Sequence, residues 1–130
     1  MATIELNEQN FEKTVTENDI VIVDFWASWC APCRAFAPTF EAASEKHPDI
    51  VFGKVNTEEA QSLAAAFQIR SIPTLMIFRE QVILFAQPGM LSPAQLEEVI
   101  EKVREIDMEQ VREDIRKQQQ EQESSQQQQS

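Results

Sequence analysis

The chain has 130 residues, of which 42% are apolar, and it carries a formal net charge of -11. This length suits one domain with a tail and leaves no room for a second catalytic domain. The acidic charge argues against nucleic-acid binding, which needs clustered Lys and Arg, and no apolar run is long enough to cross a membrane. Residues 1–10 lack the basic start and apolar stretch of a signal peptide, so we expect a cytoplasmic protein.

The first half of the chain predicts two strands and two helices. Residues 3–6 form a short strand, and Phe11 and Val15 share one face of the helix that follows it. Residues 20–27, with the sequence IVIVDFWA, are apolar at nearly every position, as expected of a strand buried on both faces of a sheet. A second helix is predicted over residues 32–46.

The second half begins with a strand over residues 51–55 and a helix over residues 57–67. Two β-rich runs, 74–78 and 82–85, flank the polar stretch Arg79-Glu80-Gln81 and predict an antiparallel hairpin. The element order up to this point alternates strands and helices, which is typical of an α/β protein.

A last helix of the domain begins at a capping box, in which Ser92 is the cap, Pro93 the first helical residue and Gln95 the reciprocal partner. The complete order β-α-β-α-β-α-β-β-α predicts three layers, α/β/α, around a central mixed β-sheet. Beyond Lys117 the chain is rich in Gln and lacks apolar residues, which is typical of disorder. We therefore divide the chain into a domain over residues 1–106, a short C-terminal helix over 107–117 and a disordered tail over 118–130.

Both cysteines stand in the motif Cys30-Ala31-Pro32-Cys33, where a buried strand ends and a helix begins. A lone C-x-x-C is compatible with a structural disulfide, half of a metal site or a redox-active pair. A reducing compartment disfavours a lasting disulfide, and a zinc site needs four ligands, whereas the chain has a single histidine, His47. We expect no metal site. Because helix N-termini stabilise thiolates, Cys30 is predicted to be an exposed nucleophile and Cys33 the more buried thiol.

Asp24 is a carboxylate within an otherwise apolar strand. If it is buried, desolvation raises its pKa, and it could act as a general base near Cys33. The alternative is an edge strand on which Asp24 faces water. Lys54, on the next strand, is either a partner that tunes Asp24 or an ordinary surface lysine. Ile72-Pro73 by itself indicates only a trans turn before a strand.

Four segments in order, VDFWASWCAPCRAFAP, KVNTEE, FQIRSIPTLMIF and PGMLSPAQLEEVI, give the chain a resemblance to the thioredoxin family over about residues 3–105. The resemblance implies the thioredoxin fold, with a cis Ile72-Pro73 bond facing the cysteine pair. It makes Cys30 the attacking thiol and Cys33 the resolving thiol of a redox-active disulfide, with Asp24 as the buried acid and Lys54 as its neighbour. The implied substrate surface consists of Trp29, Ala31, Pro32, Ile72, Pro73, Gly89 and Met90.

The function that this resemblance implies is the reduction of disulfides in cytoplasmic proteins by a monomer without a bound cofactor. Electrons would come from NADPH through a partner thioredoxin reductase. Two alternatives stay open: a more oxidising disulfide isomerase, and a co-chaperone or binding module that uses the same fold.

The sequence departs from the family pattern at three places. Ala31 follows Cys30, where glycine is usual, and this leaves the reduction potential open. Residues 79–82, REQV, replace a turn that usually contains glycine, so the geometry of the hairpin is in question. About 25 residues extend past the expected end of the fold, and no family role covers them.

Overall fold

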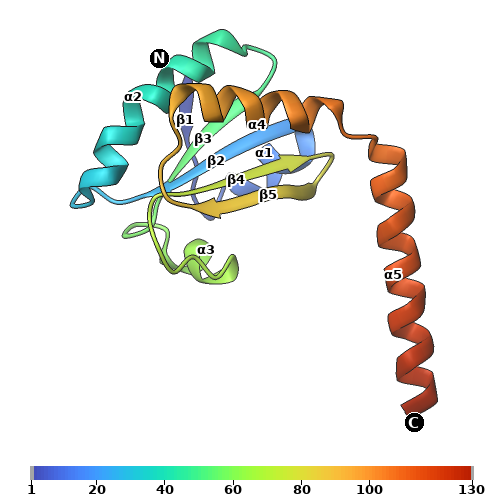
Figure 1. Ribbon diagram of the computed structural model, residues 1–130. Coiled ribbons are helices and arrows are strands. Elements are labelled where there is room, and N and C mark those ends of the chain that lie inside the picture. Colours follow the sequence, from blue (N-terminus) through green and yellow to red (C-terminus); the bar gives the residue numbers. More distant parts are fainter. Residues whose placement is uncertain (1, 130) are drawn as a thin grey trace.

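In the computed structural model, which describes residues 2–129, five strands form one mixed sheet in the order β1-β3-β2-β4-β5 (Figure 1). The strands are β1 (Thr3–Glu5), β2 (Ile20–Trp26), β3 (Val51–Asn56), β4 (Thr74–Arg79) and β5 (Val82–Pro88). The helices are α1 (Phe11–Glu17), α2 (Ala31–Lys46), α3 (Gln61–Ala66), α4 (Pro93–Glu105) and α5 (Met108–Gln129). β3 runs parallel to β1 and β2, whereas β4 is antiparallel to β2 and β5. The predicted α/β class and mixed sheet are confirmed.

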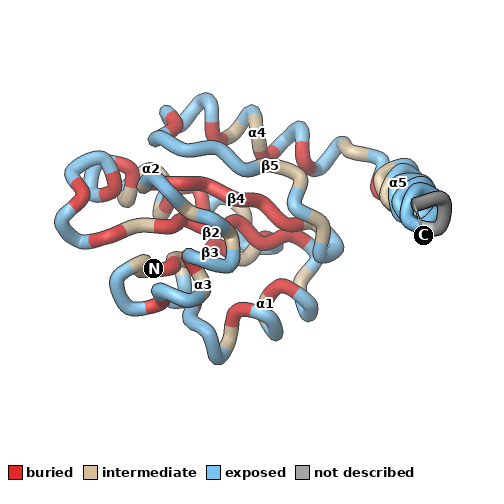
Figure 2. Tube along the Cα trace, turned by 90° about the horizontal axis from the view of Figure 1, so that it is seen from below, coloured by how far each residue is buried: buried red, intermediate tan, exposed pale blue. Residues whose placement is uncertain are grey.

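β2 lies at the centre of the sheet, and its side chains point alternately into two apolar layers. Ile20 and Ile22 pack in the layer beneath α2 and α4, which contains Phe36 and Leu96. Val21, Val23 and Phe25 pack in the opposite layer, with residues of α1 and α3. Figure 2 shows the buried sheet between these helices. The continuous apolar sequence of β2 therefore reflects burial on both faces.

α3 is shorter than the sequence predicted, because residues 57–59 form a turn and the helix begins only at Gln61. The side chain of Asn56 accepts a hydrogen bond from the N–H of Glu58, and its carbonyl accepts bonds from Glu59 and Ala60. These bonds fold the chain back at the end of β3 before a regular helix starts. A local polar turn has therefore replaced the first turn of the predicted helix.

The β4–β5 hairpin closes with the two-residue loop Glu80-Gln81, and both residues have left-handed backbone, with φ of 50° and 70°. Glycine or asparagine usually occupies such positions. Here the N–H of Glu80 donates to the carbonyl of Asp19 at 2.8 Å, and the Glu80 carboxylate forms an ion pair with Arg112 of α5. The hairpin is thus formed despite the absence of glycine, with contacts from outside the turn holding Glu80.

α5 continues as a helix through Gln129, whereas the sequence predicted a short helix over 107–117 and an irregular tail over 118–130. Gln and Glu are good helix formers, and neither Gly nor Pro interrupts the sequence after Met108. The helix extends away from the sheet (Figure 1), and the side chains of residues 118–126 are exposed. Ser130 lies outside the described residues. The division of the chain into three segments stays a prediction.

The junction between α4 and α5 is attached to the end of β4. Nη1 of Arg79 donates to the carbonyl oxygens of Val103, Arg104 and Ile106 at 2.9, 3.2 and 3.0 Å. These carbonyls lie at the C-terminal end of α4, where helical acceptors lack partners within the helix and a cation interacts favourably with the helix dipole. Met108, the first residue of α5, directly follows this junction in the sequence and is buried.

Arg79→Met should lower the free energy of unfolding by about 2 kcal/mol, since it leaves carbonyl acceptors of the α4 end without their charged donor. Chemical denaturation of the full chain measures this change. Arg116→Met is the matched control, because Arg116 is exposed and, within residues 2–129, its ion pair is with Glu113 of its own helix. This substitution should cost well under about 1 kcal/mol. Equal effects of the two substitutions would show that the Arg79 contacts do not stabilise the junction.

Candidate active site

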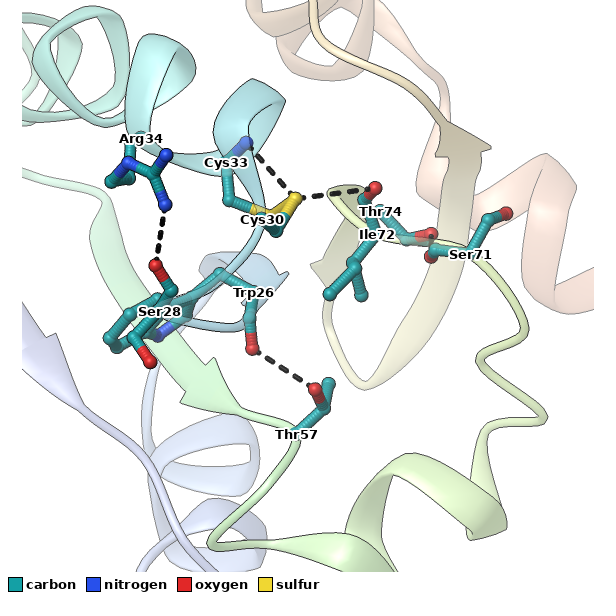
Figure 3. The surroundings of a disulfide bond; sticks show 9 residues. All are labelled: Trp26, Ser28, Cys30, Cys33, Arg34, Thr57, Ser71, Ile72 and Thr74. Carbon is teal, nitrogen blue, oxygen red and sulfur yellow. Dashed lines mark hydrogen bonds between the residues drawn. A yellow bond between two sulfur atoms is a disulfide. The ribbon is translucent and has the colours of Figure 1, made fainter.

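Cys30 and Cys33 form a disulfide at the start of α2, with their Cα atoms 5.2 Å apart. Sγ of Cys30 lies 3.7 Å from the carbonyl oxygen of Ile72 (Figure 3). Only 5% of Cys30 is exposed, and Cys33 is buried as well. The prediction of an exposed Cys30 is therefore wrong for this disulfide state, because the Ile72 loop lies against the sulfur, a contact 42 residues apart in the sequence.

Cys30 is the N-cap of α2, and its sulfur accepts a hydrogen bond from the backbone N–H of Cys33 at 3.2 Å. The first turn of α2 contains no acidic residue, and Pro32 occupies an early position where its missing N–H costs no helical bond. The positive end of the helix dipole and this N–H both favour a thiolate at Cys30 when the disulfide is reduced.

The Ile72-Pro73 peptide bond is cis, as the family resemblance implied. The hydroxyl of Thr74 donates to the carbonyl of Ser71 across this loop. The N–H of Gly89 donates to the carbonyl of Pro73 at 2.8 Å, and Gly89 has a φ of +95°, which favours glycine. The loop after β5 is therefore attached to the cis-proline loop beside the disulfide.

The loop between β2 and α2 is held by two contacts that the sequence did not reveal. Nη1 of Arg34 donates to the carbonyl of Ser28 at 2.7 Å, and the hydroxyl of Thr57 donates to the carbonyl of Trp26 at 3.1 Å (Figure 3). Both acceptors are backbone atoms, which carry no sequence signal. They fix the segment that contains Trp29, a residue that is 68% exposed.

Asp24 is 1% exposed, and neither of its carboxylate oxygens has a hydrogen-bond partner within residues 2–129. In the sheet it lies opposite Lys54 of β3 and Leu75 of β4. Because side chains alternate along a strand, Asp24 points to the same side as Ile22, into the layer beneath α2. The alternative in which Asp24 faces water at a sheet edge is therefore wrong.

Burial raises the pKa of Asp24 from 3.8 to about 7, and the positive charge of Lys54 opposes this rise without cancelling it. Nζ of Lys54 lies 4.7 Å from the centre of the Trp26 ring, in a cation–π contact. Lys54 is partly buried, so it is not the freely solvated surface lysine of the alternative interpretation. The carboxyl group can thus gain or lose a proton near neutral pH.

The proposed substrate-surface residues come from three segments: the start of α2, the cis-proline loop and the loop after β5. Trp29, Ala31, Pro32, Gly89 and Met90 are exposed, Ile72 is half-buried and Pro73 is buried. Hydrogen bonds and the Cys30 contact join these three segments, so they form a single rim around the disulfide.

His47 is the C-cap of α2, at the other end of a 16-residue helix from Cys30, a length of about 24 Å. Its Nε2 contacts Glu97 at 2.8 Å and its Nδ1 contacts Nη2 of Arg104 at 3.0 Å. His47 is therefore too far from Cys30 to form a catalytic Cys-His pair with it. Within residues 2–129, no group of three acidic, His or Cys side chains could hold a metal ion, and no helix is long and apolar enough to cross a membrane.

The family model described as Thioredoxin matches residues 2–121. The chain belongs to the thioredoxin family. It is 55% identical over 117 residues to the putative thioredoxin 2 of Streptomyces coelicolor, and the aligned region covers 90% of this chain and 87% of that protein. It is 39% identical over 106 residues to a thioredoxin of Alicyclobacillus acidocaldarius, covering 77% of this chain and 100% of that protein.

Solved thioredoxin structures have the same fold. The thioredoxin of Plasmodium falciparum matches with a TM-score of 0.71 and 31% identity, over 77% of this chain and 97% of that one. A mutant thioredoxin of Halobacterium salinarum matches with a TM-score of 0.74 and 28% identity, over 81% and 92%. With its disulfide at the start of α2, the chain is a thioredoxin-type dithiol–disulfide oxidoreductase. Members of this family act on disulfide substrates and need no bound cofactor.

The raised pKa of Asp24 makes stability depend on pH. Between 3.8, the value without burial, and about 7, the native state keeps a proton that the unfolded state has lost. The contribution of Asp24 to the free energy of unfolding should therefore be most favourable below about pH 4. It should fall by roughly 4 kcal/mol as the pH rises from there through 7.

Asp24→Asn should remove this pH dependence, because asparagine does not titrate. Denaturant unfolding of the oxidised protein at about pH 4 and about pH 8 measures it. The variant should be more stable than the wild type by a few kcal/mol at the higher pH, and the difference should shrink at the lower pH. A difference independent of pH would contradict the raised pKa.

Proposed function

We propose that this protein reduces disulfides of cytoplasmic proteins, with electrons that NADPH supplies through a partner thioredoxin reductase. The observation that carries the proposal is the Cys30–Cys33 disulfide at a helix N-terminus, lying against the carbonyl of Ile72. The membership in a family of disulfide oxidoreductases supports it. The protein would act as a monomer, and no cofactor would be bound.

In the proposed cycle, the thiolate of reduced Cys30 attacks one sulfur of a substrate disulfide. The substrate bond breaks, a mixed disulfide with Cys30 forms, and the other substrate sulfur leaves as a thiolate that takes up a proton. Cys33 then loses its proton and attacks Cys30, which releases the second substrate thiol and forms the Cys30–Cys33 disulfide. The reductase returns two electrons and two protons to the pair.

Asp24 is the proposed acceptor for the proton of Cys33. Its carboxylate lies on the face of β2 that α2 covers, and no other hydrogen bond engages it within the described chain. A pKa of about 7 keeps a useful fraction of the group deprotonated at neutral pH while leaving it basic enough to take a thiol proton. Lys54, paired with Asp24 across the strands, would tune this value.

The rim around the disulfide is the proposed substrate surface. Trp29 and Met90 supply exposed apolar area, and the carbonyl oxygen of Ile72 lies 3.7 Å from Sγ of Cys30. The carbonyl of Ile72 could accept a hydrogen bond from an extended substrate backbone, which would align the substrate disulfide with Cys30. Ala31 adds one methyl group where glycine is usual, next to the attacking sulfur.

The two cysteines should respond differently to replacement by serine. Cys30→Ser should abolish insulin reduction coupled to NADPH consumption through thioredoxin reductase, because no mixed disulfide can form. Cys33→Ser should instead accumulate a long-lived mixed disulfide with the substrate, visible by non-reducing electrophoresis or mass spectrometry. If Cys30→Ser kept full biological activity, a binding or co-chaperone function would replace the proposal.

Asp24→Asn should slow the resolution of the mixed disulfide by about tenfold or more near pH 7, because Cys33 loses its proton acceptor. Rapid-mixing kinetics with a fluorescent disulfide peptide separates this step from the attack by Cys30. The deficit should shrink at high pH, where Cys33 ionises without help. The oxidised variant's unfolding curve provides the control for correct folding, and unchanged resolution kinetics would contradict the base role.

A further inference from the structure

Met90 differs from the other methionines within residues 2–129 by its exposure. It is 47% exposed, whereas Met76 in β4 and Met108 at the start of α5 are each 5% exposed. Oxidation of a thioether requires contact with the oxidant in solution, so exposure determines which methionine reacts first. Of the methionines within residues 2–129, Met90 is therefore expected to be oxidised first.

The backbone on both sides of Met90 holds it at the rim of the disulfide site. Gly89, the preceding residue, donates its N–H to the carbonyl of Pro73 at 2.8 Å, and the neighbouring carbonyl of Ile72 lies 3.7 Å from Sγ of Cys30. Leu91, the following residue, is buried beneath α2 and α4. Met90 is therefore held between two anchored neighbours and cannot move into the core without displacing one of them.

We propose that Met90 is a site of reversible oxidation by peroxides, and that its sulfoxide weakens the docking of protein substrates. The second part rests on the proposed function, in which the rim binds disulfide-containing proteins. In the oxidised protein, both cysteine sulfurs are bonded to each other and buried, which leaves the Met90 thioether as the exposed sulfur at the site.

The reaction with hydrogen peroxide transfers one oxygen atom to the sulfur of Met90. The thioether is oxidised by two electrons to the sulfoxide, and the peroxide is reduced to water. Methionine sulfoxide reductases reverse the change, since a dithiol is oxidised to a disulfide while the oxygen leaves as water. The sulfoxide is polar, so it must be desolvated when an apolar substrate surface covers the rim.

Hydrogen peroxide treatment of the full, disulfide-bonded chain tests the site itself. Peptide mass spectrometry follows the gain of one oxygen at Met76, Met90 and Met108 over time. Met90 should react at least about tenfold faster than the other two, as its exposure requires. Equal rates at Met76 or Met108 would overturn the assignment.

The effect on docking is tested with two substrates of different size. Oxidation of Met90 should lower kcat/KM for insulin several-fold, but should change the rate with 2-hydroxyethyl disulfide, which is too small to cover the rim, by less than about twofold. Met90→Leu is the matched variant: the ratio of its insulin activity after and before peroxide should stay near one. Treatment with methionine sulfoxide reductases should restore the wild type.

Two results would overturn the docking effect: an unchanged kcat/KM for insulin after complete oxidation of Met90, or the same loss in the peroxide-treated Met90→Leu variant. A failure of the proposed function is distinguishable from both, because the untreated wild type would then not reduce insulin at all. The oxidation rates of the three methionines decide the modification site independently of any activity.

Discussion

β2 is hydrogen-bonded to β3 on one side and to β4 on the other, and it carries one carboxyl group, that of Asp24, among apolar residues. The position of the strand decides the chemistry of that group. At a sheet edge Asp24 could point to water, but in the centre it is desolvated under α2 and keeps a pKa of about 7. The same strand ends at the loop before Cys30, so the buried acid and the cysteine pair belong to one rigid unit.

Cys30 and Asp24 lie in two different electrostatic environments, which have opposite effects on their ionisation. The start of α2, where the N–H of Cys33 donates to the Cys30 sulfur and the first turn holds no acidic residue, favours negative charge on Cys30. The apolar layer below it disfavours negative charge on Asp24. In the proposed cycle Cys30 attacks as the thiolate, and Asp24, which titrates near neutral pH, accepts the proton of Cys33.

The parts of the chain that depart from the family pattern are stabilised by contacts from distant elements. Glu80 takes a left-handed conformation without glycine, and it is held by Asp19 and by Arg112 of α5. Arg79, beside it, reaches the carbonyls at the end of α4. The ion pair of Arg112 therefore attaches the first part of α5 to the β4–β5 hairpin, and the family match extends through residue 121.

Apolar runs and periodicities, β-rich segments and one capping box were sufficient to predict the five strands, the first four helices and the α/β class, because these local patterns record burial and helix ends. The motifs also placed both cysteines at a strand–helix junction. Only the tertiary structure decided the burial of Cys30 by the Ile72 loop, the face on which Asp24 lies, and the backbone acceptors of Arg34 and Arg79. Each of these depends on residues distant in the chain or on carbonyl groups that every residue has, and local sequence carries no signal for either.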